Sequence, residues 1–429
     1  MNVNVVLALQ LIGTAATTRF DETVAPPHFG HALRDEFLFG ENVTQMNHGA
    51  YGATPKKVLD AQFVHIKDIE SDITKWYHME MPGNPYKAAL LAVRQRIAAY
   101  INSPEEDTVL VDNASNAINV LLKRWVFEPN EVLLEFSTAH GPFQAFYSWL
   151  SATRGVEIVK VGFAFPLSGP EDILAALNET LSSLRAQGKS ASVAVVSQVS
   201  SCPAVILPVE RIVRVLREAG IPSIVDGAHA LGAVEVDVRK MAPDFWFGNG
   251  HKWLYTPKSV CVLYISKPYQ GKYWPEPTVV DSFGDAFTDR FIWSGTRDRS
   301  TFLTVPDALD FRQWVGGEVA VRSYIQQLSR DGAALLVNMW NRRGSHKSGL
   351  LAPDSMQGTM HNVIVPTDSK ATCEKLGREL VDTYKFQIFA MSVDSIPCYV
   401  RAHAQIYLTL DDYRRLGELV LGIIDRIVT

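Results

Sequence analysis

Apolar and polar residues follow two periods along this chain, and each period predicts a different element. Short apolar runs bounded by turn-forming residues are typical of buried strands, and they lie at residues 107–111, 131–136, 156–161, 192–199, 222–227, 244–249 and 259–265. Segments with apolar residues at helical spacing alternate with these runs, at residues 55–73, 84–101, 116–127, 141–155, 170–188 and 208–220. Because strands and helices alternate, we expect an α/β fold with a mostly parallel, seven-stranded sheet covered on both faces.

A chain of 429 residues is long for one hydrophobic core, so two domains are expected. The alternation ends at residues 266–285, where proline, glycine and aspartate predict a long loop. A long helical region follows at residues 306–340. The pattern predicts a large domain at residues 46–295 and a smaller α+β domain at 296–429, with residues 1–45 as an N-terminal segment that packs with the small domain.

Composition excludes several classes of partner. Lysine and arginine together number 41 against 46 acidic residues, and no long basic run is present, which argues against a nucleic-acid-binding protein. Residues 3–18 resemble a weak signal peptide, but no lysine or arginine precedes their apolar part, and this weighs against secretion. No other stretch approaches the roughly 18 uninterrupted apolar residues of a membrane helix, so no membrane partner is expected.

The cysteines give a prediction about redox environment. Cys202, Cys261, Cys373 and Cys398 are widely spaced and form no C-x-x-C pair. We therefore expect neither a disulfide framework nor a structural metal site. A reducing compartment, the cytoplasm, fits this pattern.

Polar residues follow several of the predicted strands, where ligands bind in open α/β sheets. Taken singly these residues are weak signals, because an asparagine or serine at a helix start is usually only a cap and an aspartate at a strand end is usually a turn residue. The candidates are Asn113, Ala114, Ser115, His140, Asp226, His229 and Lys252. The first three lie at the start of a predicted helix, a position that suits the binding of an anion.

The pairing of Asp226 with Lys252 at the ends of neighbouring strands is more specific than any one residue. An acid that holds a pyridinium nitrogen and a lysine that forms a Schiff base are the two groups that pyridoxal phosphate (PLP) requires of a protein. The sequence therefore predicts a PLP site at this edge of the sheet.

Around these two residues the chain resembles the PLP-dependent class V aminotransferase-like family of fold type I. Within that family it is similar to the isopenicillin N epimerase-like branch, which includes the C–S lyases of ergothioneine synthesis. The resemblance covers most of the chain and is carried by the cofactor segment at residues 226–253. It also rests on an Asn-His-Gly substrate loop, a phosphate loop, a ring-stacking turn, a Gly-Thr segment and a carboxylate-binding arginine segment, at residues 46–59, 111–122, 136–145, 293–300 and 399–413.

The resemblance implies a role for each candidate. Lys252 bonds covalently to the cofactor and moves protons, Asp226 pairs with the ring nitrogen, and His140 stacks on the ring. His229 donates to the cofactor's phenolic oxygen. The remaining cofactor contacts fall to Asn113, Ala114, Ser115, Asn249, His251 and, across the interface of a homodimer with shared active sites, Thr296.

The resemblance also implies an amino-acid substrate. Arg401 would hold its α-carboxylate through two parallel hydrogen bonds, and Asn47 and His48 belong to the substrate loop. The C–S lyases of the branch carry tyrosine where this chain has His140, so a role of that tyrosine in acid–base chemistry is not carried over. Trp76, Tyr77 and Tyr86 either line the pocket or belong to the core, and both alternatives stay open.

We expect a PLP-dependent, lyase-like enzyme that deprotonates Cα and then eliminates a β or γ substituent. Related C–C or C–N bond formation in secondary metabolism belongs to the same prediction. The alternatives are epimerisation, transamination and desulfurase-type sulfur transfer. Sulfur transfer needs a nucleophilic cysteine, and Cys398 is the candidate because it closely precedes Arg401, although a buried structural role for this cysteine is the simpler interpretation.

Overall fold

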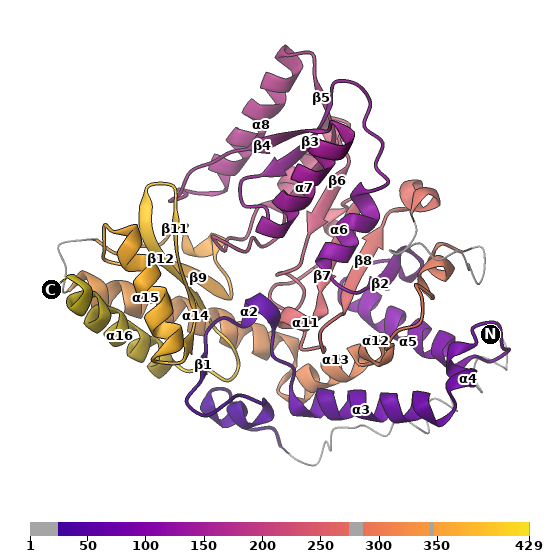
Figure 1. Ribbon diagram of the computed structural model, residues 1–429, viewed down its shortest axis with the longest axis horizontal. Helices are drawn as coiled ribbons and strands as arrows, with labels where there is room; N and C mark the ends of the chain where they lie inside the picture. The colour runs from indigo at the N-terminus through magenta and orange to yellow at the C-terminus, as the bar shows by residue number, and fades with distance from the viewer. Residues whose placement is uncertain (1–24, 274–285, 343–346, 429) are drawn as a thin grey trace.

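A computed structural model describes residues 25–273, 286–342 and 347–428 (Figure 1). The segment resembling a signal peptide, at residues 3–18, lies outside the described residues. Most of the loop predicted at residues 266–285 lies outside them as well.

The main sheet has seven strands in the order β2-β8-β7-β6-β5-β3-β4. β8 runs antiparallel to β2 and β7, and the other pairings are parallel. The strands are β2 (Thr108–Val111), β3 (Glu131–Phe136), β4 (Glu157–Val161), β5 (Ser190–Ser197), β6 (Ser223–Asp226), β7 (Phe245–Asn249) and β8 (Cys261–Ile265). Each lies at a predicted apolar run, so the α/β class and the mostly parallel seven-stranded sheet are confirmed.

Both faces of this sheet are buried, which explains why its strands read as continuous apolar runs. Val132 and Leu134 of β3 pack into one core cluster, and Leu133 of the same strand packs into another. The first cluster is completed by α8 (Pro170–Ala186) and α9 (Val209–Glu218), and the second by α6 (Ala114–Leu122) and α7 (Gly141–Arg154). The remaining helices of this region are α3 (Lys56–Ser71), α4 (Ile73–Tyr77), α5 (Pro85–Tyr100), α10 (Val238–Met241) and α12 (Ser300–Leu303).

A smaller sheet follows in the C-terminal part of the chain, with the order β11-β12-β9. Figure 1 shows it beside helices of the same C-terminal part of the chain, away from the main sheet. Its elements are β9 (Met360–Ile364), β11 (Phe389–Val393), β12 (Ile396–His403), α14 (Gly317–Asn341), α15 (Lys370–Asp382) and α16 (Leu410–Val428). The helical region predicted at residues 306–340 is divided between α13 (Val305–Trp314) and α14, because Gly316, which lies between them, and Gly317, the first residue of α14, adopt positive φ angles of 127° and 83°.

The N-terminal segment contacts this C-terminal part. Leu33, Phe37 and Met46 belong to the same core cluster as α14 and α16, and β1 (Thr44–Gln45) pairs in parallel with β10 (Phe386–Gln387). These contacts concern the packing of the N-terminal segment, and the domain boundaries stay a prediction. In the described residues, none of the helices combines the length and the apolar character that a bilayer crossing requires.

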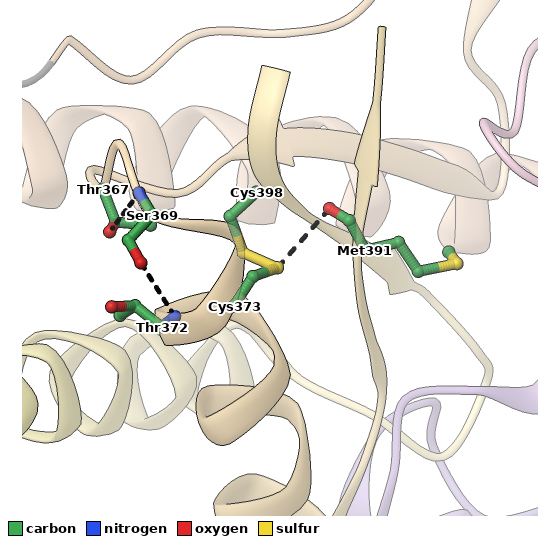
Figure 2. The surroundings of a disulfide bond; sticks show 6 residues. All are labelled: Thr367, Ser369, Thr372, Cys373, Met391 and Cys398. Atoms are coloured by element: carbon green, nitrogen blue, oxygen red, sulfur yellow. Dashed lines mark hydrogen bonds between the residues drawn. A yellow bond between two sulfur atoms is a disulfide. The ribbon is translucent and has the colours of Figure 1, made fainter. Parts of the chain in front are cut away.

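The prediction from the cysteines was wrong about disulfides. Cys373 of α15 and Cys398 of β12 form a disulfide, with their Cα atoms 5.3 Å apart (Figure 2). The two residues are 25 positions apart in sequence, and only the packing of α15 against β12 brings them together. The expectation of a reducing compartment rested on the absence of disulfides, so this disulfide removes its support, since disulfides persist mainly in oxidising environments.

Candidate active site

Lys252 lies where the parallel strands of the main sheet end. It is on α11 (Gly250–Trp253), directly after β7, and Asp226 is the last residue of the neighbouring strand β6. Lys252 and Asp226 are 7% and 5% exposed, and His229, in the loop after β6, is also buried. The structure therefore brings together the lysine, the acid and the histidine that the sequence singled out.

Burial brings the pKa of the Lys252 amine close to physiological pH. Burial lowers its pKa from 10.5 to about 8, and the negative charge of Asp226 opposes this shift. Its Nζ lies 3.0 Å from Nε2 of His229. The indole N–H of Trp253 donates to Nδ1 of His229 at 3.5 Å, which favours the tautomer with its proton on Nε2. A neutral lysine can accept that proton as a hydrogen bond and is also a nucleophile and a base.

Asp226 is a buried acid that forms no ion pair among the residues that the structure describes, although the charge of Lys252 acts on it. Burial raises its pKa to about 6, although the backbone N–H of Ala228, which donates to Oδ1 at 2.9 Å, opposes the shift. A positively charged group placed against this carboxyl would hold it ionised. A pyridinium N–H is such a group.

A short helix, α2 (His48–Tyr51), packs against α11 and fixes the backbone of the lysine. Burial lowers the pKa of His48 to about 3, so its ring is neutral. Nε2 donates to the carbonyl of Lys252 at 2.6 Å, and Nδ1 accepts from the hydroxyl of Tyr407 at 3.0 Å. At Gly52, where φ is +72°, a Cβ would lie 1.7 Å from the carbonyl oxygen of His251, so only glycine allows this approach. Both ring nitrogens of His48 thus have protein partners, and its predicted role toward substrate stays untested.

Arg401 of β12 is a buried cation that is 1% exposed. Nη1 donates to the carbonyl oxygen of Ser201 at 2.6 Å and to its hydroxyl at 3.0 Å, and Nη2 donates to Oδ1 of Asn47 at 2.8 Å. Its Nε is buried without a hydrogen-bond partner. Within the described part of the chain Arg401 has no carboxylate partner. The guanidinium is thus oriented by neutral groups and keeps a donor available.

The N-terminus of α6 lies next to the lysine loop. The side chain of Asn113 caps this helix by accepting from the backbone N–H of Asn116 at 2.9 Å. The N–H of Ala114 donates to Oδ1 of Asn249 at 2.9 Å, which joins two predicted phosphate-binding segments. Ser115 is exposed. Nδ1 of His251 is buried without a partner, and burial lowers the pKa of this histidine to about 4.

Two other predicted cofactor residues lie on loops. His140 immediately precedes α7, and its pKa falls to about 4, first through burial and then through the charges of Lys252 and Arg401. Thr296 is exposed on the loop before α12. Arg299 fixes that loop by donating to the carbonyl groups of Ile292 and Gly295. The role of Thr296 toward a second subunit stays a prediction.

The aromatic residues left open by the sequence pack near the loop before α12. The hydroxyl of Tyr77 donates to the carbonyl of Arg297 at 2.8 Å, and the hydroxyl of Tyr86 accepts from Nη1 of Arg299 at 3.3 Å. Trp76 packs against the core cluster of the main sheet. These contacts account for the three residues structurally, and a pocket-lining role stays untested.

Sequence reasoning missed several residues that contact the site. Ser201 and Cys202 follow β5. Ligands of open α/β sheets bind beyond the carboxyl ends of the strands, so the end of β5 could have been considered like the others. His403 lies two positions beyond Arg401 and so shares its face of β12. Its Nδ1 accepts from the N–H of Gly49, and its Nε2 is buried without a partner. Cys398, the candidate for sulfur transfer, is held in the disulfide instead.

These features fit PLP. A buried lysine with a depressed pKa, an acid that lacks a cation, and an unpartnered histidine nitrogen beside a helix N-terminus match the aldehyde, the ring nitrogen and the phosphate in turn. The fit rests on the donors and acceptors that the chain presents.

Comparison with known proteins points to the same cofactor. Residues 49–282 match the family "Aminotransferase class-V". An L-cysteine desulfhydrase of Arabidopsis thaliana is 26% identical over 410 residues, covering 89% of this chain and 88% of the relative. An isopenicillin N epimerase of Streptomyces clavuligerus is 26% identical over 404 residues, covering 90% and 96%.

The fold has solved counterparts. The apo structure of a cysteine desulfurase from Thermococcus onnurineus matches with a TM-score of 0.70 and 18% identity, over 93% of this chain and all of that one. At this identity the likeness concerns the fold, which it supports as fold type I. Because the family match covers more than half of the chain, this protein belongs to the aminotransferase class-V family and is a PLP-dependent, lyase-like enzyme.

Proposed function

We propose that this enzyme removes the Cα proton of an α-amino acid and then eliminates a thiol or a similar group from Cβ or Cγ. The observation that carries the proposal is Arg401, a buried cation without an acidic partner among the described residues, in the same site as Lys252, whose amine has its pKa lowered to about 8. Isolated buried charges are costly, so they are usually compensated by a partner. The α-carboxylate of a substrate is the partner that completes this site.

Arg401 orients the substrate through that carboxylate. Ser201 accepts from Nη1 and Asn47 accepts from Nη2, which fixes the plane of the guanidinium. The unpartnered Nε and the second hydrogen of Nη2 form the edge that remains for two parallel hydrogen bonds. An amino acid held at this edge has its Cα fixed relative to the main sheet and to Lys252.

Lys252 is the base of the proposed reaction. PLP, when bound, supplies an electron sink conjugated to the substrate's amino group. Lys252 takes the proton from Cα, because its pKa of about 8 lets the neutral amine accept it near physiological pH. Asp226 balances positive charge at the ring nitrogen, and Nε2 of His229, 3.0 Å from the amine, holds Lys252 in place.

Elimination is favoured over the alternatives by the chain's relatives and by its cysteines. The desulfhydrase relative is named for release of sulfide from cysteine, whereas the epimerase relative keeps epimerisation as the second candidate. Sulfur transfer loses its proposed nucleophile, because Cys398 is bonded to Cys373. The active form is proposed to be a homodimer in which the exposed Thr296 reaches the partner's phosphate site.

The test is a product analysis with L-cysteine and S-substituted cysteines. Elimination breaks the Cα–H and Cβ–S bonds and releases a thiol, and hydrolysis of the remaining fragment yields pyruvate and ammonia in equal amounts. Lys252→Ala is the matched control and is expected to give none of these products. Recovery of the substrate as its D-enantiomer, without pyruvate, would support epimerisation instead. Absence of any product from all of these amino acids would refute the proposal.

A further inference from the structure

The loop after β5 places a thiol against the guanidinium of Arg401. Sγ of Cys202 lies 3.1 Å from Nη1 of Arg401, and Cys202 is exposed. The other free cysteine of the described residues, Cys261, is fully buried in β8. The chain therefore presents one accessible thiol within the described structure, and it lies at the proposed carboxylate site.

Arg401 provides a second and independent observation at the same place. It is 1% exposed, its Nε has no partner, and its other contacts are to neutral groups of Ser201 and Asn47 apart from the thiol itself. A buried cation without an acidic partner can bind any anionic group that reaches it. Besides a substrate, the source nearest to the guanidinium is the side chain of Cys202.

We propose that Cys202 is an oxidation site, and that its sulfinate pairs with Nη1 of Arg401, neutralises the guanidinium and so weakens the binding of a substrate carboxylate at the Nε–Nη2 edge. This inference rests on the proposed function, in which Arg401 binds that carboxylate. The modification would make the enzyme's affinity for amino acids depend on exposure to peroxide.

The chemistry needs hydrogen peroxide as its only added reactant. The thiolate of Cys202 attacks one oxygen, an S–O bond forms as the O–O bond breaks, and hydroxide leaves, which gives the sulfenic acid. A second peroxide transfers one oxygen to the sulfur, and its other oxygen leaves as water. Loss of a proton from the resulting sulfinic acid gives the sulfinate. Each step oxidises sulfur by two electrons and reduces one peroxide.

The sulfinate matches what Arg401 lacks. Like a carboxylate it carries one negative charge on two oxygens, and such a group forms short, charge-assisted hydrogen bonds with a guanidinium. Because Sγ already lies at Nη1, the added oxygens lie beside the guanidinium without any movement of the backbone. Neutralisation of the guanidinium is expected to weaken amino-acid binding by at least about 30-fold.

The experiment treats the PLP-loaded enzyme with hydrogen peroxide and makes two measurements. Peptide mass analysis is expected to find two added oxygen atoms on Cys202 and none on Cys261. Titration with L-alanine, followed by the absorbance of the bound cofactor, reports affinity without turnover. Treated wild type is expected to lose affinity, whereas Cys202→Ser is expected to bind L-alanine equally before and after treatment.

Three results would overturn the inference. Cys202 could stay unmodified, the oxidised enzyme could bind L-alanine as before, or Cys202→Ser could lose as much affinity as wild type on treatment. Failure of the proposed function is a separate outcome. A wild type that responds to L-alanine but releases no thiol or pyruvate from cysteines would refute elimination and leave this inference standing, whereas an untreated wild type that does not respond to L-alanine would refute the carboxylate role of Arg401. In that case the claim that the sulfinate weakens the binding of a substrate carboxylate falls with it.

Discussion

Replacing Arg401 by lysine tests the proposed site while keeping its charge. The guanidinium uses two nitrogens to contact Ser201 and Asn47 and retains a planar edge for a carboxylate. A lysine ammonium is a point charge that cannot form the planar, two-bond contact and cannot satisfy Ser201, Asn47 and a substrate in the same geometry. Arg401→Lys is therefore expected to be poorly active on amino acids.

The size of the loss follows from the burial of Arg401. Its side chain is 1% exposed and makes no ion pair within the described residues, so its contact with a substrate carboxylate is largely shielded from water. Losing a buried, charged contact of this kind costs about 2–5 kcal/mol. This corresponds to a fall in kcat/KM between roughly 30-fold and several thousand-fold.

The assay compares two matched substrates in wild type and in Arg401→Lys. One is an amino acid, and the other is the amine that lacks its carboxylate. The amine is expected to be a poor substrate of wild type, and its kcat/KM is expected to change little in Arg401→Lys, because it has no carboxylate for Arg401 to bind. Equal losses on both would show that Arg401 supports the fold rather than the substrate. Retained activity of Arg401→Lys on amino acids would refute the carboxylate role.

Three further predictions use other parts of the structure. Burial lowers the pKa of Lys252 to about 8, so the rate of covalent PLP binding by the apoenzyme should rise about tenfold per pH unit below pH 8 and level off above it. A rate that does not change with pH, measured by stopped-flow absorbance, would contradict this. Removing the Cys373–Cys398 disulfide by double substitution with alanine should lower the free energy of unfolding by about 3.5 kcal/mol, the chain-entropy value for a separation of 25 residues. A denaturant midpoint equal to that of wild type would show that the disulfide does not stabilise the fold. Mixing inactive Lys252→Ala with inactive Thr296→Ala subunits should restore part of the activity through hybrid dimers, and an active monomer in sedimentation would rule out shared sites.

Much of the fold and the centre of the site could be predicted because their signals are local. Strands buried on both faces, such as β3 and β7, are apolar at most positions, so they stand out in the sequence. In a parallel sheet the strand ends gather at one edge, so Asp226 and Lys252 could be placed together without knowing the exact packing. The motifs around them supplied the cofactor.

The rest depended on contacts between distant segments. Cys373 and Cys398 are ordinary residues of a helix and a strand until α15 packs on β12. The contact of Cys202 with Arg401 joins the loop after β5 to strand β12, at a separation of 199 positions. For His48, the sequence indicated a substrate loop but could not show that the carbonyl of Lys252 and the hydroxyl of Tyr407 take both ring nitrogens. Such pairings are decided by tertiary packing, which no local pattern encodes.

The histidines around Lys252 explain how one arginine can direct the substrate. Burial lowers the pKa of His48 to about 3 and of His140 and His251 to about 4, so these rings are neutral near pH 7. Neutral imidazoles can hold Lys252 and the cofactor by hydrogen bonds without adding positive charge. If they were cationic, they would compete for the carboxylate and would lower the pKa of Lys252 further. Because they are neutral, the fixed positive charge of this cluster is on Arg401, and the orientation of an anionic substrate is set by that residue.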